Sequence, residues 1–350
     1  MNSHFAKLFI FLASILILMI QCDCESIEPC GTPGEIIVLN SQSKVDSFQL
    51  TLPPSCNSYL GTIQIRGEIT SLAKLGFLRS IGGIDIVQTK LKNLDGLQKL
   101  EIIYGNLSLS TIDQFSSLEH LQGIKYIGGD LFLSRLNSME FLDGFNALKT
   151  VKGNLIISAN EKLIKIRGFR NLHSIDGHCF ISGNFLLSSI EGFNNLIKIN
   201  KLLLIMENKS LTRLDGFQNL DTIGADLIFE KNDSLVNLDG LSGLKSIGES
   251  ISLTNNIKLQ NIDAFLNITE LQEALLITQN DELLNINGLK NIKNIKTIVQ
   301  ITDNKKLAIC CGVFEILKNN KVGGSILING NLSGCNTVDE ILQAGISNCQ

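Results

Sequence analysis

A 24-residue period is the feature that most constrains the fold of this chain. Leucine follows each asparagine of the repeat by three residues, from Leu163 to Leu307, and a glycine row runs from Gly96 to Gly312, interrupted by His120 and Ala264. A fixed period in the twenties is typical of a solenoid, in which each repeat buries its apolar face against its neighbours. The asparagines recur without interruption at Asn160, Asn184, Asn208, Asn232, Asn256, Asn280 and Asn304.

Each repeat contains one short segment with the alternation of a strand. Leu155 and Ile157 alternate with polar or variable positions, so both side chains are expected to point inward from a strand. Equivalent strands in successive repeats would pair in parallel, about 4.8 Å apart. The sequence therefore predicts a mainly β solenoid of about ten 24-residue coils.

The repeated asparagine is expected to form an internal ladder. At a corner after a strand, buried peptide groups need partners, and an Asn amide offers two donors and an acceptor. We therefore assign the asparagines a structural role rather than a catalytic or metal-binding one. Leu136 and Ile112 occupy this column in earlier coils, where an apolar corner is expected. The glycine row indicates a corner with positive φ or close backbone approach.

The N-terminus indicates export. Residues 8–20 form an apolar run of 13 residues after Lys7, too short for a spanning helix and suited to a signal peptide covering residues 1–24. No second long apolar segment follows, so we expect a secreted chain with no transmembrane segment. After the signal peptide, the sequence predicts three parts: an N-terminal disulfide cap with the first irregular coils (25–90), the repeat solenoid (91–312) and a C-terminal cap (313–350).

Export makes the cysteines candidates for disulfides at the two ends of the solenoid. We expect Cys30 to pair with Cys56, and Cys335 to pair with Cys310 or Cys311, while the connectivity that involves Cys349 stays open. Cys179 lies in the inward column that holds Leu155, Leu203 and Leu227 in other coils, so it is expected to be a free, buried thiol.

Three segments resemble receptor L-domain proteins, relatives of the leucine-rich repeats. They are the repeat "LDGLSGLKSIGESISLTNN", the N-terminal "CNSYLGTIQIRGEI" and the C-terminal "CCGVFEILKNNKVGGSILINGNLSGCNTVDEI". The likeness covers about residues 30–340. It implies a right-handed parallel β-helix, like the L domains of the insulin and epidermal-growth-factor receptors, which bind protein ligands, and like fungal cell-wall relatives. A fold resemblance implies function only loosely.

No constellation of catalytic residues stands out. The four histidines, His4, His120, His173 and His178, are too few and too separated for a triad or a metal site. Aspartates recur before the glycines at Asp95, Asp143, Asp215 and Asp239, which favours turn capping over catalysis. We expect no enzyme activity, no metal and no cofactor. We also expect no nucleic-acid partner, because the net charge is −4 and no basic stripe with interleaved aromatics occurs.

The outward position between the two inward residues of each strand is apolar in five consecutive coils. A contiguous exposed apolar patch marks an interaction site more strongly than scattered leucines do. We interpret it as a docking surface for a partner, with homodimerisation and cover by a terminal segment as alternatives. The five residues are Phe132, Ile156, Phe180, Leu204 and Ile228.

Five N-x-S/T sequons occur in the chain. Asn208 and Asn232 lie in the inward asparagine column, where a glycan has no room, so we expect both to be unmodified. Asn106, Asn267 and Asn331 lie outside that column and are candidates for glycosylation.

These observations leave three hypotheses for function. The first is a secreted, non-enzymatic recognition protein that binds an extracellular protein or glycan. The second is a structural protein of a cell wall or cell-surface matrix. The third is a β-helical carbohydrate-active enzyme. Loss of partner capture after substitution of Phe132 and Phe180 would favour the first, and polysaccharide hydrolysis would favour the third.

Overall fold

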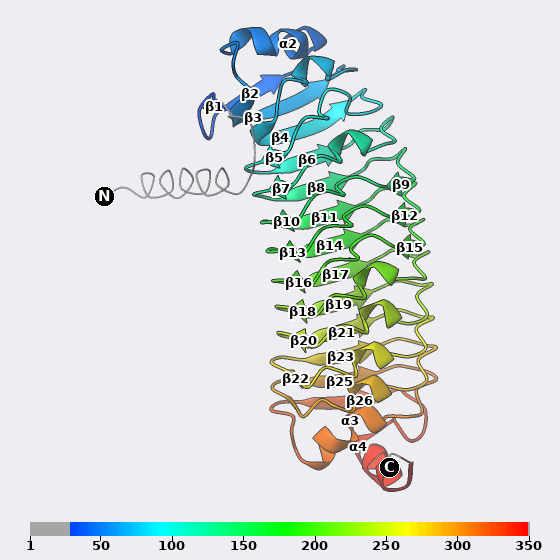
Figure 1. Cartoon of the computed structure of the whole chain (residues 1–350). Coiled ribbons are helices and arrows are strands. Elements are labelled where there is room, and N and C mark those ends of the chain that lie inside the picture. The colour runs from blue at the N-terminus through cyan, green and yellow to red at the C-terminus, as the bar shows by residue number, and fades with distance from the viewer. Residues whose placement is uncertain (1–28, 349–350) are drawn as a thin grey trace, which may run out of the picture.

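The chain folds around one long parallel sheet that runs the length of the molecule (Figure 1). The structure, a computed structural model, describes residues 29–348; the signal peptide expected at 1–24 lies outside them. Successive repeats stack one upon the next, with the N-terminal segment at one end and the C-terminal helices at the other (Figure 1).

The main ladder of this sheet consists of one strand from each repeat. Its pairing is parallel throughout, and from β6 to β25 each residue pairs with the residue 24 positions later. The strands are β2 (Ile36–Leu39), β3 (Ser58–Gly67), β4 (Ser80–Thr89), β6 (Leu107–Ser110), β8 (Leu131–Ser134), β11 (Leu155–Ser158), β14 (Cys179–Ser182), β17 (Leu203–Met206), β19 (Leu227–Glu230), β21 (Ile251–Thr254), β23 (Leu275–Thr278), β25 (Val299–Thr302) and β26 (Ile326–Asn329).

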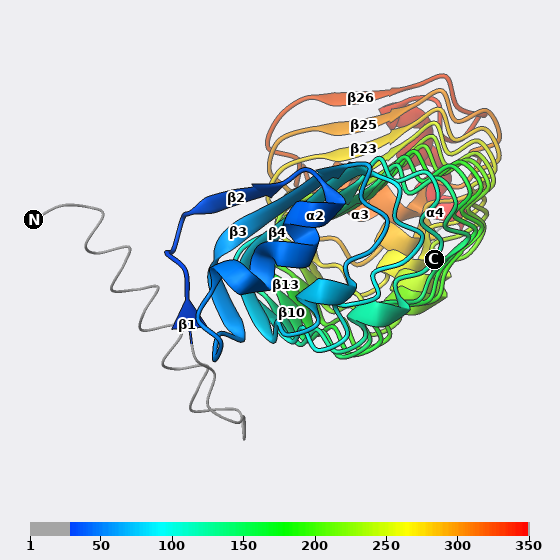
Figure 2. The ribbon, with the colours of Figure 1, turned by 90° about the horizontal axis from the view of Figure 1, so that it is seen from above.

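Two-residue strands form further strips beside the main ladder. The first strip comprises β1 (Pro29–Cys30), β5 (Ile102–Ile103), β7 (Tyr126–Ile127), β10 (Thr150–Val151), β13 (Ser174–Ile175), β16 (Lys198–Ile199), β18 (Thr222–Ile223) and β20 (Ser246–Ile247), and β22 (Glu270–Leu271) pairs with β24 (Asn294–Ile295). The second comprises β9 (Phe141–Leu142), β12 (Lys165–Ile166) and β15 (Ser189–Ile190). In Figure 2 the turns are seen end-on, one behind another.

Short 3-10 helices occur close to this second strip in several other coils. They are η2 (Ala73–Leu75), η3 (Glu119–Leu121), η4 (Asp215–Phe217), η5 (Asp239–Leu241), η6 (Asp263–Phe265) and η7 (Asn287–Leu289). Two of the aspartates expected to cap the corners make ion pairs: the carboxylates of Asp143 and Asp215 pair with Arg167 and Arg213 at 2.8 and 2.6 Å. Side-chain caps at these helices come from Asn or Ser: Asn237 Oδ1 accepts from the Asp239 N–H, and Ser117 Oγ accepts from the Glu119 N–H.

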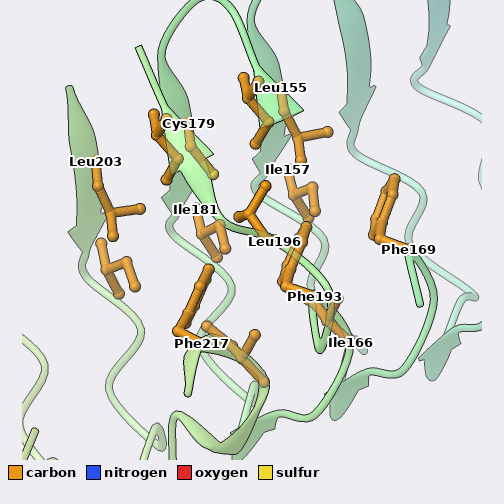
Figure 3. Packing of buried hydrophobic residues seen from close by; sticks show 14 of the residues in the cluster. Leu155, Ile157, Ile166, Phe169, Cys179, Ile181, Phe193, Leu196, Leu203 and Phe217 are labelled. Atoms are coloured by element: carbon orange, nitrogen blue, oxygen red, sulfur yellow. The ribbon is translucent and has the colours of Figure 1, made fainter. Parts of the chain in front are cut away.

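The interior is filled by apolar columns that run along the axis. The inward residues of the main ladder, such as Leu155 and Ile157, are fully buried, as the alternation predicted. Four phenylalanine rings form a stack that was not predicted, with neighbouring centroids 5.0–5.3 Å apart and ring planes nearly parallel; three of them, Phe169, Phe193 and Phe217, are labelled in Figure 3. The stacked rings are Phe145, Phe169, Phe193 and Phe217.

The asparagine ladder is confirmed. All seven predicted asparagines are fully buried. Asn208 is a representative rung: its Nδ2 donates to the Ile181 carbonyl at 2.8 Å, and its backbone N–H donates to Asn232 Oδ1 at 3.2 Å. The apolar corner expected in the earlier coils is confirmed too, because Leu136 and Ile112 are buried.

The ladder has one more rung than the period predicted. Asn331 Oδ1 accepts from the backbone N–H of Asn304 at 3.0 Å, 27 residues earlier, and Asn331 Nδ2 donates to the carbonyls of Ile301 and Cys335 at 2.8 and 3.0 Å. The expectation that Asn331 lies outside the ladder is therefore wrong. The last coil is three residues longer than the others, so a search at a fixed spacing of 24 residues does not reach Asn331.

The glycine row reflects close backbone approach. Among the row's glycines, Gly96 has a positive φ of 110°, whereas a Cβ on Gly168 or Gly192 would overlap the carbonyl oxygen of the glycine 24 residues earlier. Positive φ occurs instead at the residue before each ladder asparagine, for example Ala159 at 54° and Lys231 at 53°. The repeat thus places left-handed backbone at a position where sequence shows no consistent glycine.

Both ends of the stack are closed by caps. At the N-terminal end, α2 (Gln42–Ser47) and η1 (Phe48–Thr51) place Phe48 edge-on against Tyr59, with ring centroids 5.3 Å apart. At the C-terminal end, α3 (Cys311–Lys318) packs against α4 (Val338–Asn348). The stacked part thus begins at β2 and ends at β26, outside the predicted limits 91–312 on both sides.

Disulfides secure these caps. Cys30 pairs with Cys56, and Cys310 pairs with Cys335, which confirms the first predicted bond and selects between the two alternatives for the second. Cys311 is disulfide-bonded as well, and Cys349 lies outside the described residues. Cys179 is a free, buried thiol in the inward column between Leu155 and Leu203, as predicted (Figure 3). Its burial raises its pKa to about 12.

Candidate recognition surface

The five predicted outward residues form one continuous row on the main ladder, called here the apolar stripe. Phe132, Ile156 and Phe180 are direct register partners on β8, β11 and β14. Leu204 and Ile228 continue the row on β17 and β19. Because neighbouring strands are about 4.8 Å apart, the stripe is about 20 Å long. The predicted adjacency is confirmed, whereas the binding role stays a prediction.

The apolar stripe is accessible. All five side chains are half-buried, as expected for residues that contact neighbours within a sheet while their tips face outward. Within residues 29–348, no element lies across this face of the main ladder (Figure 1). Cover by a segment within residues 29–348 is therefore excluded, and the remaining proposals are tested below.

Polar rows flank the apolar stripe on both sides. On one side lies a hydroxyl row, in which Ser158 Oγ donates to Ser134 Oγ at 3.1 Å. Met206 and Glu230 interrupt that row next to Leu204 and Ile228, and Met206 widens the apolar surface there. Methionine is flexible and polarisable, and it adapts well to the shape of a partner.

A second polar ladder, not predicted from the sequence, runs along the other flank. Asn106 Oδ1 accepts from the backbone N–H of Asp130 at 2.8 Å, and Asn154 Oδ1 accepts from that of His178 at 2.8 Å. The His178 ring stacks on Phe180 with centroids 5.3 Å apart. These bonds hold the start of each strand in register, so the apolar stripe lies on a rigid support.

The apolar stripe is interrupted toward both ends of the ladder. Its column continues with Ser108 on one side and with Ser252, Leu276 and Gln300 on the other. Leu276 has the same strand environment as the stripe residues but lies between two polar neighbours. It therefore offers a matched control for substitutions within the apolar stripe.

The residues suited to metal or thiol chemistry are dispersed in the part of the chain that the structure describes. No group of three or more His, Cys, Asp or Glu side chains in residues 29–348 is arranged to hold a metal ion. His173 Nδ1 lies 2.7 Å from the Asn171 carbonyl oxygen, and the Cys179 thiol is enclosed in the core. Among these residues, no helix is long and apolar enough to cross a membrane.

The sequons differ in how their amide nitrogens are used. Asn208 and Asn232 are buried rungs whose Nδ2 atoms each donate to two or more acceptors. Asn331, now a rung as well, uses both Nδ2 hydrogens. Asn267 is exposed and its Nδ2 makes one bond, to the Ser242 carbonyl at 3.2 Å. Asn106 is exposed and bonds through its oxygen.

Comparison with known proteins adds no relative. No protein-family model, no curated protein and no solved structure matches the chain. The class that the coordinates define is a mainly β protein with one long parallel sheet, capped at both ends, which carries a continuous apolar stripe on its outer face.

Proposed function

We propose that this chain is a secreted, non-enzymatic recognition protein that resembles the receptor L domains and binds an extracellular partner through the apolar stripe. The stacked repeats then form a right-handed parallel β-helix whose role is to hold the stripe flat and rigid. The observation that carries the proposal is the register of five apolar side chains on adjacent strands, half-buried and open to solvent.

Burial of the apolar stripe in a complex would supply most of the binding free energy. Aromatic and large aliphatic side chains near the centre of an interface dominate affinity, and a surrounding polar rim excludes water. The hydroxyl row and the second polar ladder provide such a rim on the two flanks of the stripe. A rigid scaffold also lowers the entropy that is lost on binding. An extracellular protein with an apolar face is therefore the favoured partner.

The test compares capture by the mature wild-type protein and by two variants. Material from the extracellular space or cell surface is passed over each immobilised protein. We expect Phe132→Ser/Phe180→Ser to lose the captured partner and Leu276→Ser to retain it. Equal capture by all three proteins would contradict the proposal. Wall or matrix association that persists in the double variant without any captured partner would favour the structural role instead.

Light scattering separates a partner protein from a second copy of the chain as the occupant of the apolar stripe. We expect the wild type and Phe132→Ser/Phe180→Ser to be folded monomers with matching circular dichroism. A wild-type dimer that dissociates on substitution would assign the stripe to self-association.

A further inference from the structure

The C-terminal coils carry a local excess of positive charge. Residues 290–321 contain seven lysines and two acidic residues, Asp303 and Glu315, although the whole chain has a net charge of −4. Two of the lysines are neutralised by ion pairs, because Lys305 contacts Asp281 and Lys306 contacts Glu282, each at 2.7 Å. The excess therefore lies with the other lysines of this segment.

Three of these lysines surround a hollow between the η7–β24 turn and α3, called here the basic hollow. It has a volume of about 320 Å³, and Lys290, Lys293 and Lys321 line it. All three lysines are exposed, and none of them is in an ion pair within residues 29–348. The basic hollow is therefore a site where positive charge from two separate segments converges, with Glu315 as the one carboxylate in its lining.

The rest of the lining offers groups that suit a sugar. Ile292 and Ile316 are buried and form an apolar floor. Asn291 Nδ2 donates to the Leu266 carbonyl at 2.6 Å, and Asn319 Nδ2 donates to Glu315 Oε2 at 3.0 Å. The nitrogens of both amides are thus engaged, and their oxygens remain as acceptors for hydroxyl groups.

We propose that the basic hollow binds an acidic polysaccharide, with its sulfate or carboxylate groups on the lysines and its hydroxyls on the amide oxygens. A simple anion such as phosphate would leave the amide oxygens and the apolar floor unused, whereas an acidic sugar uses all three features. Glu315 opposes an anion in the hollow and so limits affinity. The basic hollow is built from residues 290–321, outside the apolar stripe, so its failure would not affect the proposed partner site.

The test is titration of the full mature protein with a heparin oligosaccharide, an oligogalacturonate and a DNA duplex of similar charge, at low salt. We expect binding to one or both oligosaccharides, and the tighter of the two identifies the anionic group. Lys290→Gln/Lys293→Gln/Lys321→Gln should weaken binding by about tenfold, the sum of three exposed charge contacts. Glu315→Gln should strengthen it by a few-fold, because a repulsive charge is removed.

A charge-matched control removes three exposed lysines elsewhere, as Lys162→Gln/Lys201→Gln/Lys258→Gln. We expect this variant to bind the oligosaccharides as the wild type does. Failure of the wild type to bind either oligosaccharide would overturn the proposal. Equal weakening in both triple variants, or DNA binding as tight as that of the oligosaccharides, would also overturn it, because bulk charge alone would then explain the result.

Discussion

The side-chain oxygen of Asn184 accepts two hydrogen bonds from Asn160, one from the backbone N–H at 3.0 Å and one from Nδ2 at 3.1 Å. The same relationship links every later rung as far as Asn331. The side-chain oxygen of each asparagine therefore accepts hydrogen bonds from the asparagine of the preceding coil, and its own backbone N–H and Nδ2 donate to the asparagine of the next coil. Replacing one rung leaves polar groups on both sides without partners.

A central rung should be more costly to remove than the last one. Asn232→Leu deprives the backbone N–H of Asn208 of its acceptor and the Ile205 carbonyl of its donor, both in the core. We expect a loss of about 3 kcal/mol or more in the free energy of unfolding, measured by urea denaturation. Asn331→Leu, at a half-buried end, should cost about 1 kcal/mol. Equal and small effects would show that the ladder contributes little.

Two glycines only nine residues apart should differ strongly in how much stability is lost on substitution by alanine. Gly192→Ala places a Cβ against the Gly168 carbonyl oxygen, which forces the stacked backbones apart and should cost about 3 kcal/mol. Gly183 has a φ of 65°, a Cβ there would meet the Ala159 backbone only at 3.8–3.9 Å, and Ala159 itself adopts φ 54° at the same position one coil earlier. Gly183→Ala should therefore change stability by about 1 kcal/mol or less. Thermal unfolding of both variants checks this contrast.

The buried thiol should make stability depend on alkaline pH. Burial raises the pKa of Cys179 to about 12 in the folded state, whereas an unfolded thiol titrates near pH ~8.5. The folded pKa is higher than the unfolded pKa, so the unfolded state loses the thiol proton first as pH rises. The contribution of the Cys179 thiol to the free energy of unfolding is therefore complete below pH ~8.5 and is lost as pH rises toward 12. Relative to Cys179→Ala, the wild type should lose about 1.4 kcal/mol per pH unit in this range. A pH-independent difference would place the thiol in contact with water.

Glycans should occupy two of the five sequons. When the chain is made in a eukaryotic secretory pathway, mass spectrometry of glycopeptides should find Asn106 and Asn267 modified, because each is exposed and keeps a free amide hydrogen. Asn208, Asn232 and Asn331 should be unmodified, because both hydrogens of each nitrogen are used inside the fold. A glycan on Asn232 of folded protein would contradict the inward assignment.

The features that sequence could predict are those that depend only on the 24-residue step. Stacking places residues of equal register on neighbouring strands, so the period alone put Ile156 beside Phe132 and Phe180 and put Asn160 beside Asn184. The accessibility of the apolar stripe did not follow from the period, because it depends on which segments pass over the sheet.

Other features depend on backbone geometry or on breaks in the step. The Asn331 rung requires a coil of 27 residues. The left-handed backbone conformation at Ala159 recurs in other coils at residues of different types, so no sequence pattern marks it. The phenylalanine stack was visible as a column of similar residues, but its face-to-face geometry was not. The basic hollow joins Lys293 to Lys321 across the junction of the last coils with α3, where the repeat ends.

Photo-crosslinking from the apolar stripe tests the recognition surface most directly. A photo-reactive phenylalanine derivative is placed at Ile156, or at Leu276 as a control, and the protein is irradiated with extracellular material. We expect an adduct with a different protein from position 156, none from position 276, and loss of the adduct in the Phe132→Ser/Phe180→Ser background. A crosslinked dimer of the chain itself, or no adduct from position 156, would contradict the assignment of the apolar stripe as a partner-binding surface.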